Sequence, residues 1–184
     1  MDPAKPQNRR SFLTYTAYAM GAIAVGASGF AMIDSMNPAA DVWARDITNV
    51  DLKNIKPGQR VVVAWRRMPI FIYHRTKEDI AEARSVDWRK LRDPQSDEER
   101  VLKGHENWLV VIGLCSLNGL VLFGNREGQP RGEKGGWKCW HCLSAFDKSG
   151  RVYYGPVSKN LGIPAYFFME DGSLRIGGKP ITPL

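Results

Sequence analysis

The chain has 184 residues, of which 43% are hydrophobic and 24% charged, which allows one globular domain plus an appendage. Its net charge is +7, but the lysines and arginines are scattered among acidic residues and do not form basic stripes with interleaved aromatic residues. We therefore expect no nucleic-acid partner, and a mixed basic surface that faces an acidic protein or a membrane.

The N-terminal appendage is predicted to be a membrane anchor. Residues 12–33 carry no formally charged side chain. At about 1.5 Å of rise per residue, such a stretch spans a bilayer core of about 30 Å. A cleaved export signal is the alternative, but its apolar part would be about 7 to 15 residues, which is shorter than this one.

The residues before the anchor, Asn8-Arg9-Arg10-Ser11-Phe12-Leu13, are typical of a twin-arginine signal, which exports proteins that have already folded. The positive charges lie on the N-terminal side of the apolar stretch, which favours a cytoplasmic N-terminus. We predict a cytoplasmic segment over 1–11, a single-pass anchor over 12–33, a hinge linker over 34–46 and an exported domain over 47–184.

The exported part is predicted to be mainly β. Arg60–Trp65 and Pro69–Tyr73 are β-branched and aromatic runs close enough to form a hairpin. Thr76–Leu91 is the one helical pattern, with Thr76, Glu78 and Asp79 resembling an N-terminal cap. Further strands are expected at 108–112, 137–139, 151–154, 165–168 and 173–176. Such short strands between turns indicate a small antiparallel β-sandwich or barrel.

Two short segments hold all the cysteines of the chain. They are Cys115-Ser-Leu-Asn-Gly-Leu120 and Cys139-Trp-His-Cys-Leu-Ser144. Thiols and an imidazole in two loops are typical of a metal site, an iron–sulfur centre or a redox-active thiol pair. His74 and His105 are interpreted as surface histidines, and Asp79, Glu82 and the run 97–99 as solvated charge.

The order of these parts resembles the Rieske iron–sulfur subunit of the cytochrome bc1 complex, in its alphaproteobacterial or mitochondrial form. The likeness covers nearly the whole chain. The motifs that carry it are the twin-arginine anchor, Met36-Asn-Pro38, Asp41-Val42, Pro69-Ile-Phe-Ile-Tyr-His-Arg-Thr76, Gly104-His-Glu-Asn-Trp-Leu-Val-Val-Ile-Gly113, Gly135-Gly-Trp137, Asp147-Lys-Ser-Gly-Arg151, Gly155-Pro156 and Asn160-Leu161.

The resemblance implies a β-sandwich with a smaller cluster-binding subdomain at about 113–158. It also implies a [2Fe–2S] cluster that takes electrons from quinol at cytochrome b and passes them to cytochrome c1. The complex that carries out this reaction is the ubiquinol–cytochrome c reductase. It places the anchor in the bacterial plasma membrane or mitochondrial inner membrane. The β domain would lie on the periplasmic or intermembrane-space side.

The ligand loops depart from the pattern that the family shows. Its first loop is Cys-x-His followed by a second cysteine, where this chain has Cys115, Leu117 and Leu120. Its second loop is Cys-x-Cys-His-Gly-Ser, where this chain has Cys139, His141, Cys142, Leu143 and Ser144. Leucine and cysteine thus stand at the two histidine ligand positions, and the cysteines that bridge the loops in the family are replaced as well.

Four interpretations of the cysteine segments follow. The first is an altered cluster held by Cys115, Cys139, Cys142 and His141. The second is a thiol–disulfide function of the Cys-x-x-Cys pair Cys139 and Cys142. The third is a cofactor-free structural or assembly subunit of the complex, and the fourth is a zinc site.

Overall fold

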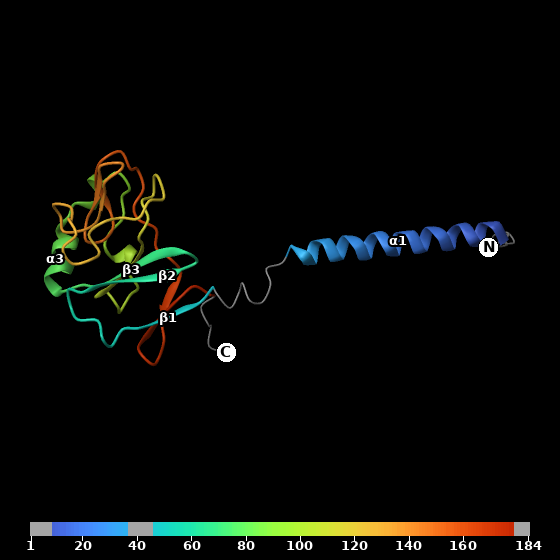
Figure 1. Cartoon of the computed structure of the whole chain (residues 1–184), viewed down its shortest axis with the longest axis horizontal. Coiled ribbons are helices and arrows are strands. Elements are labelled where there is room, and N and C mark those ends of the chain that lie inside the picture. Colours follow the sequence, from blue (N-terminus) through green and yellow to red (C-terminus); the bar gives the residue numbers. More distant parts are fainter. Residues whose placement is uncertain (1–8, 37–45, 179–184) are drawn as a thin grey trace. The chain divides into compact units, whose positions relative to one another are not determined.

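The computed structural model describes residues 9–36 and 46–178. The chain divides into two compact units, of which the first contains helix α1 and the second all the strands (Figure 1). The first residues of the expected twin-arginine segment and most of the expected hinge, including Asn37, Pro38 and Asp41-Val42, lie outside the described residues.

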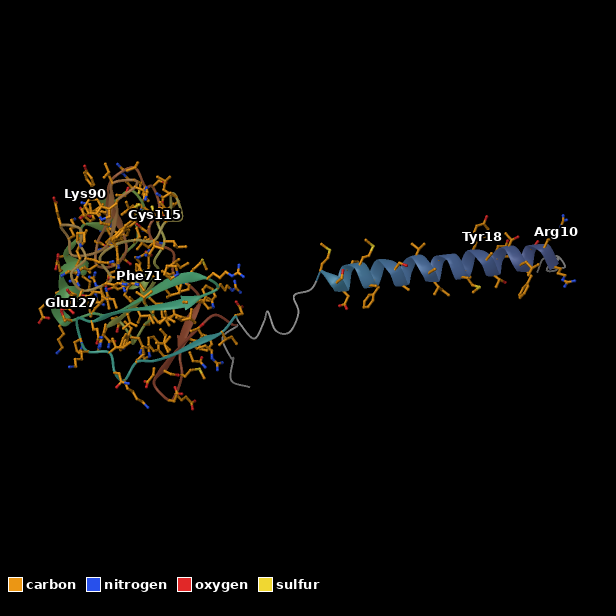
Figure 2. All side chains as sticks on the ribbon, viewed as in Figure 1. Arg10, Tyr18, Phe71, Lys90, Cys115 and Glu127 are labelled. Carbon is orange, nitrogen blue, oxygen red and sulfur yellow. The ribbon has the colours of Figure 1, made fainter. Side chains whose placement is uncertain are left out.

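Helix α1 runs over Arg9–Ser35, and none of its residues is buried. It is long and apolar enough to cross a membrane. Its hydroxyl groups bond within the helix: Thr14, Thr16 and Ser28 each donate to the carbonyl four residues earlier, at 2.8–2.9 Å. Such bonds satisfy polar groups where no water is available. Figure 2 shows the side chains of α1 standing out on all sides of the helix.

The central sheet of the second unit has the strand order β2-β3-β4. Its strands are β2 (Arg60–Trp65), β3 (Met68–His74) and β4 (Trp108–Ile112), all antiparallel. Arg66 and Arg67 form the β2–β3 turn with φ of 48° and 63°, the left-handed conformation that two-residue hairpin turns need. The predicted hairpin is therefore present.

A second sheet, ordered β1-β9-β8, joins the two ends of the described β domain. Its strands are β1 (Thr48–Asp51), β8 (Tyr166–Phe168) and β9 (Ser173–Ile176). Strand β1 was not predicted because Thr48–Asp51 shows little alternation of hydrophobic and polar residues. Its pairing with β9, from Thr48 with Ile176 to Asp51 with Ser173, stabilises it instead.

The third sheet, ordered β5-β6-β7, lies within the expected subdomain at 113–158. Its strands are β5 (Lys138–Cys139), β6 (Ser144–Phe146) and β7 (Val152–Tyr154). One hydrophobic core joins this sheet to the central one and includes Phe71, Trp137 and Phe146, each at most 1% exposed. A second core lies between the first two sheets and includes Ile70, Ile72 and Leu174. The expected mainly β, antiparallel fold is confirmed.

Helix α3 covers Lys77–Ser85 and is shorter than predicted. Its N-terminus is as expected: Thr76 Oγ1 accepts from the Asp79 backbone, while the Asp79 carboxylate accepts from the Thr76 backbone. The helix ends because Val86 is extended, and short 3-10 turns follow at Trp88–Lys90 and Glu98–Arg100.

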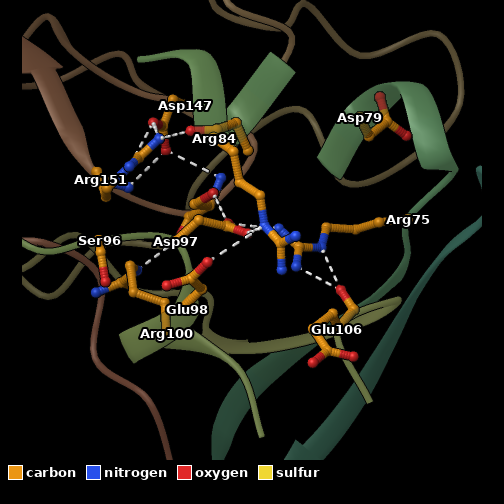
Figure 3. Close-up of polar contacts among 12 residues, drawn as sticks. Arg75, Asp79, Arg84, Ser96, Asp97, Glu98, Arg100, Glu106, Asp147 and Arg151 are labelled. Atoms are coloured by element: carbon orange, nitrogen blue, oxygen red, sulfur yellow. Dashed lines mark hydrogen bonds and ion pairs between the residues drawn. The ribbon is translucent and has the colours of Figure 1, made fainter. Parts of the chain in front are cut away.

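The interpretation of Asp79 and Asp97 as solvated charge is wrong. Asp79 is 8% exposed and accepts hydrogen bonds from Tyr73 (2.5 Å) and Lys148 (2.7 Å). Asp97 is 2% exposed and pairs with the buried Arg75 at 2.6 Å (Figure 3). The charged partners, Lys148 of Asp79 and Arg75 of Asp97, are distant from them in the sequence, so charge patterning along the chain could not reveal these pairs.

Candidate functional site

The first cysteine segment is a tight loop that follows strand β4. The Cys115 N–H donates to the Leu120 carbonyl, and the Gly119 N–H donates to the Cys115 carbonyl, both at 2.8 Å. Gly119 has a φ of +68°, which glycine adopts without strain. Ser116 Oγ donates to the Lys159 carbonyl at 2.7 Å, so the loop is also held by a segment beyond β7.

The second cysteine segment is the turn between β5 and β6. Cys139 pairs with Ser144 at the base of this hairpin. Within the turn, Leu143 has a φ of +49°, although it is not a glycine. Gly155 packs against the base of the hairpin, where a Cβ would lie 2.2 Å from Ser144 Oγ. Only glycine therefore lets the β7 end approach the loop this closely.

The two loops bring the three thiols together. The sulfurs of Cys115, Cys139 and Cys142 all lie within 4.8 Å of one another, and Cys115 Sγ is 3.4 Å from Cys142 Sγ. Cys115 and Cys139 are buried, while Cys142 is half-buried. All three thiols are free. Figure 2 labels Cys115 and, in the same core, Phe71.

The fourth predicted ligand, His141, is exposed and does not belong to this group. The other histidines lie elsewhere. His74 is not the surface residue that we expected, because it is half-buried, stacks on Trp108 and bonds to the Ile55 carbonyl. His105 is exposed and stacks on Phe168.

The environments of two thiols differ. Burial, helped by the neighbouring thiols of Cys142 and Cys139, raises the pKa of Cys115 to about 11, although the backbone N–H groups of Leu117 and Asn118 act to lower this pKa. Burial also acts to raise the pKa of Cys142, but hydrogen bonds from Cys139 and Ser144 outweigh it and lower this pKa. Cys142 is therefore the thiol that ionises more readily of the two.

These residues do not fit the two-histidine cluster that the resemblance implies. Such a cluster needs two thiolates on one iron and two imidazoles on the other. Cys115 and Cys139 supply the thiolates, but Leu117 has no ligand atom and is 58% exposed, and Cys142 supplies sulfur in place of an imidazole nitrogen. The donor set is three sulfurs.

Five large apolar side chains in the two loops, or directly after the first of them, are exposed. They are Leu117, Leu120, Val121, Trp140 and Leu143, each between 41% and 61% exposed.

Asn118 is a site residue that the sequence analysis missed. Its Nδ2 lies 3.8 Å from Cys139 Sγ, and its Oδ1 accepts from the Leu120 N–H at 3.1 Å. It therefore connects the first loop to the cysteine of the second. The Asn118-Gly119 pair predicts a turn, but nothing in the sequence places the amide beside a sulfur.

Comparisons with known proteins give consistent relatives. A family model described as "Ubiquitinol-cytochrome C reductase Fe-S subunit TAT signal" matches residues 2–39. The chain is 42% identical to the ubiquinol-cytochrome c reductase iron-sulfur subunit of Rhodospirillum rubrum, over 95% of this chain and 94% of that protein. It is 44% identical to the subunit of the same name from Rickettsia felis, over 94% and 95%.

Two further relatives extend the comparison. The chain is 47% identical to the mitochondrial cytochrome b-c1 complex subunit Rieske-3 of Nicotiana tabacum, over 78% of this chain and 51% of that protein. A chain of a solved structure titled "Hyperthermophilic respiratory Complex III" shares the fold, with a TM-score of 0.50 and 19% identity, over 88% of this chain and 98% of that one.

Proposed function

Because the chain belongs to the family of Rieske iron–sulfur subunits of ubiquinol–cytochrome c reductase, we propose that it is a structural subunit of such a complex that does not carry the two-histidine [2Fe–2S] centre. In this role it contacts cytochrome b and cytochrome c1. It transfers no electron from quinol, although the resemblance implies that step.

The proposal rests mainly on Leu117. This leucine stands at a position where the family pattern has a histidine ligand, and its hydrocarbon side chain cannot bind iron. No imidazole in the described residues takes its place beside the three sulfurs, because the group of converging ligand atoms contains cysteines alone. The second iron of a Rieske centre would have no imidazole ligand.

Several features support a retained place in the complex. The anchor helix and the antiparallel domain are both present, and the similarity to curated subunits covers more than nine-tenths of the chain. We propose that α1 spans the bacterial plasma membrane or mitochondrial inner membrane with its N-terminus inside. The β domain then lies on the periplasmic or intermembrane-space side.

The competing function is electron transfer through an altered cluster with Cys115, Cys139, Cys142 and His141 as ligands. The convergence of the three thiols favours it. The position of His141 does not, because its side chain is exposed and lies outside the group. A thiol–disulfide function of Cys139 and Cys142 has less support, since Cys142 Sγ also lies 3.4 Å from Cys115 Sγ and the loops bring together three thiols and not a pair.

Co-purification tests the structural role. The full chain, tagged and expressed in the cell that makes its complex, is solubilised in mild detergent and captured. We expect b-type and c-type haem absorbance in the eluate in a fixed ratio to the chain. The control is the same membrane preparation without the tag. Elution of the chain without either haem would contradict the proposal.

A further inference from the structure

We propose that Cys115, Cys139 and Cys142 form a site for one soft tetrahedral metal ion of the zinc class. The proposal extends the proposed function, because a metal without redox chemistry is compatible with a subunit that moves no electrons. It requires neither a two-iron cluster nor the partners of the complex.

The spacing of the sulfurs is the first argument. A tetrahedral zinc ion with Zn–S bonds of about 2.3 Å holds its sulfurs about 3.8 Å apart. The three sulfurs here all lie within 4.8 Å of one another, and the Cys115 and Cys142 sulfurs are 3.4 Å apart. A single ion can therefore contact all three after small side-chain shifts. In a two-iron cluster, thiolates on different irons are separated by both irons and their bridging sulfides.

The polar groups around the sulfurs are the second argument. The Asn118 amide donates to Cys139 Sγ at 3.8 Å, and the Cys115 and Cys142 sulfurs are within hydrogen-bond distance of each other at 3.4 Å. The amide donor stabilises a negative thiolate on Cys139, and outer donors of this kind orient metal ligands.

The burial of the site is the third argument. Cys115 and Cys139 are 2% and 1% exposed and lie in the hydrophobic core with Phe71 and Trp137. Cys142 is half-buried. An ion among the sulfurs would therefore be enclosed by the core beside Cys115 and Cys139, and we propose water as the fourth ligand because Cys142 is the most exposed of the three cysteines.

Binding involves proton release and no electron transfer. Three S–H bonds break, three metal–sulfur bonds form, and three protons pass to the solvent. Zinc is preferred among the soft metals because it combines thiolate ligands with tetrahedral geometry and an open fourth position.

Metal analysis of the full chain tests the proposal. The chain is purified anaerobically in detergent without chelators, and its zinc, iron and acid-labile sulfide are measured. The protein freed of metal is then titrated with Zn²⁺ against a chromophoric chelator and with Co²⁺ in a spectrophotometer. We expect one Zn²⁺ per chain and an intense thiolate-to-Co²⁺ charge-transfer band.

Variants locate the site. Replacing any one of the three cysteines by serine should weaken Zn²⁺ binding at least about 100-fold; the variants are Cys115→Ser, Cys139→Ser and Cys142→Ser. Loss of a group that only contacts a metal ligand already costs up to about 100-fold in affinity, and loss of a ligand itself should cost at least as much. The matched control is His141→Ala, which removes an adjacent exposed side chain and should keep the affinity within about threefold. If a cysteine variant does not fold, the Co²⁺ spectrum of the unaltered chain still reports thiolate ligation.

The inference would be overturned by absence of stoichiometric Zn²⁺ binding or by an isolated chain with a Cys115–Cys142 disulfide. It would also be overturned by retained affinity in the cysteine variants or by a loss in His141→Ala as large as theirs. Two irons and two sulfides per chain would overturn both the metal site and the proposed function. A chain that binds neither iron nor zinc but co-purifies with the cytochromes would overturn the metal site alone.

Discussion

Leu143 has a backbone conformation that favours glycine. Its φ is +49°, and its side chain is 61% exposed, so little packing compensates for the conformation. A left-handed residue that is not glycine costs about 1–2 kcal/mol. The position follows Cys142, which is one of the three converging thiols, so this strain lies directly in the second cysteine loop.

Replacing this leucine should stabilise the protein. We expect Leu143→Gly to raise the free energy of unfolding by about 0.5–1 kcal/mol, because relief of the strain exceeds the entropy that glycine costs. Thermal unfolding of the detergent-solubilised chain measures it. Leu117→Gly is the matched control, since Leu117 is equally exposed but has no positive φ. Equal stabilisation by both variants would contradict the explanation.

Asp79 connects helix α3 to strand β3 and to the turn after strand β6. It accepts from Tyr73 on β3 and from Lys148 after β6. Burial acts to raise the pKa of Asp79, but hydrogen bonds from Lys148, Tyr73 and Thr76 outweigh it and lower the pKa from 3.8 to about 2. The ionised carboxylate is therefore favoured by folding.

The pH dependence of stability follows from this shift. A carboxyl group with a lowered pKa stabilises the folded state above pH 4, and the stabilisation is lost as the pH falls from about 4 to about 2. The difference in pKa corresponds to about 2 kcal/mol at neutral pH. Asp79→Asn should remove this amount and flatten the stability profile between pH 4 and 2. Glu82→Gln, which removes the more exposed partner of Lys148, should not.

At the scale of elements, a buried ion pair joins the central sheet to the third one. Arg75 follows β3 and pairs with Asp97 at 2.6 Å, with side chains 0% and 1% exposed. Ser149, in the turn between β6 and β7, donates to the same Asp97 oxygen at 2.5 Å. Figure 3 shows Arg84 between Asp97 and Glu98, with its Nε 3.8 Å from a carboxylate oxygen of each.

Breaking this pair should be costly. Asp97→Ala leaves the Arg75 cation buried without its partner, so we expect a loss of about 3–5 kcal/mol in unfolding free energy. Glu98→Gln, at the exposed end of the same group, should change it by less than about 0.5 kcal/mol. Denaturant titration of both variants measures their free energies of unfolding. Similar losses in the two variants would contradict the expectation that the buried pair contributes more to stability than the exposed one.

The elements were more predictable than their contacts. The β2–β3 hairpin, β4 and the apolar helix were evident because hydrophobic runs and turns are local properties. Strand β1 and the end of α3 were not, since the pairing of Thr48–Asp51 with β9 and the extended Val86 arise from tertiary structure. In the site, the motif predicted the three converging cysteines. It could not predict that His141 is exposed or that Asn118 approaches a sulfur.

At the scale of the whole molecule, the scaffold agrees with the family pattern while the two cysteine loops depart from it. The chain has an apolar N-terminal helix, three antiparallel sheets and similarity to the family over most of its length, while the group of converging ligand atoms in the described residues contains three sulfurs and no imidazole. The fold does not depend on a two-histidine centre if the sheets, the buried ion pairs and the two cores stabilise it without one.

This independence predicts that the centre can be rebuilt. The combined variant Leu117→His, Leu120→Cys, His141→Cys, Cys142→His and Leu143→Gly restores the family pattern in both loops. We expect it to bind a [2Fe–2S] cluster with the EPR spectrum of two-histidine ligation after reduction. The same variant with Cys115→Ser is the control and should bind none. A folded combined variant without a cluster would show that the scaffold has changed beyond the ligand loops.

The acid-labile sulfide content of the unaltered chain tests the central claim most directly. Sulfide is the proper quantity because haem iron from attached cytochromes does not contribute to it. The full chain, isolated anaerobically from its membrane and separated from the cytochromes, should contain no stoichiometric sulfide. Its reduced sample should show no Rieske EPR signal. Two sulfides per chain together with that signal would contradict the account.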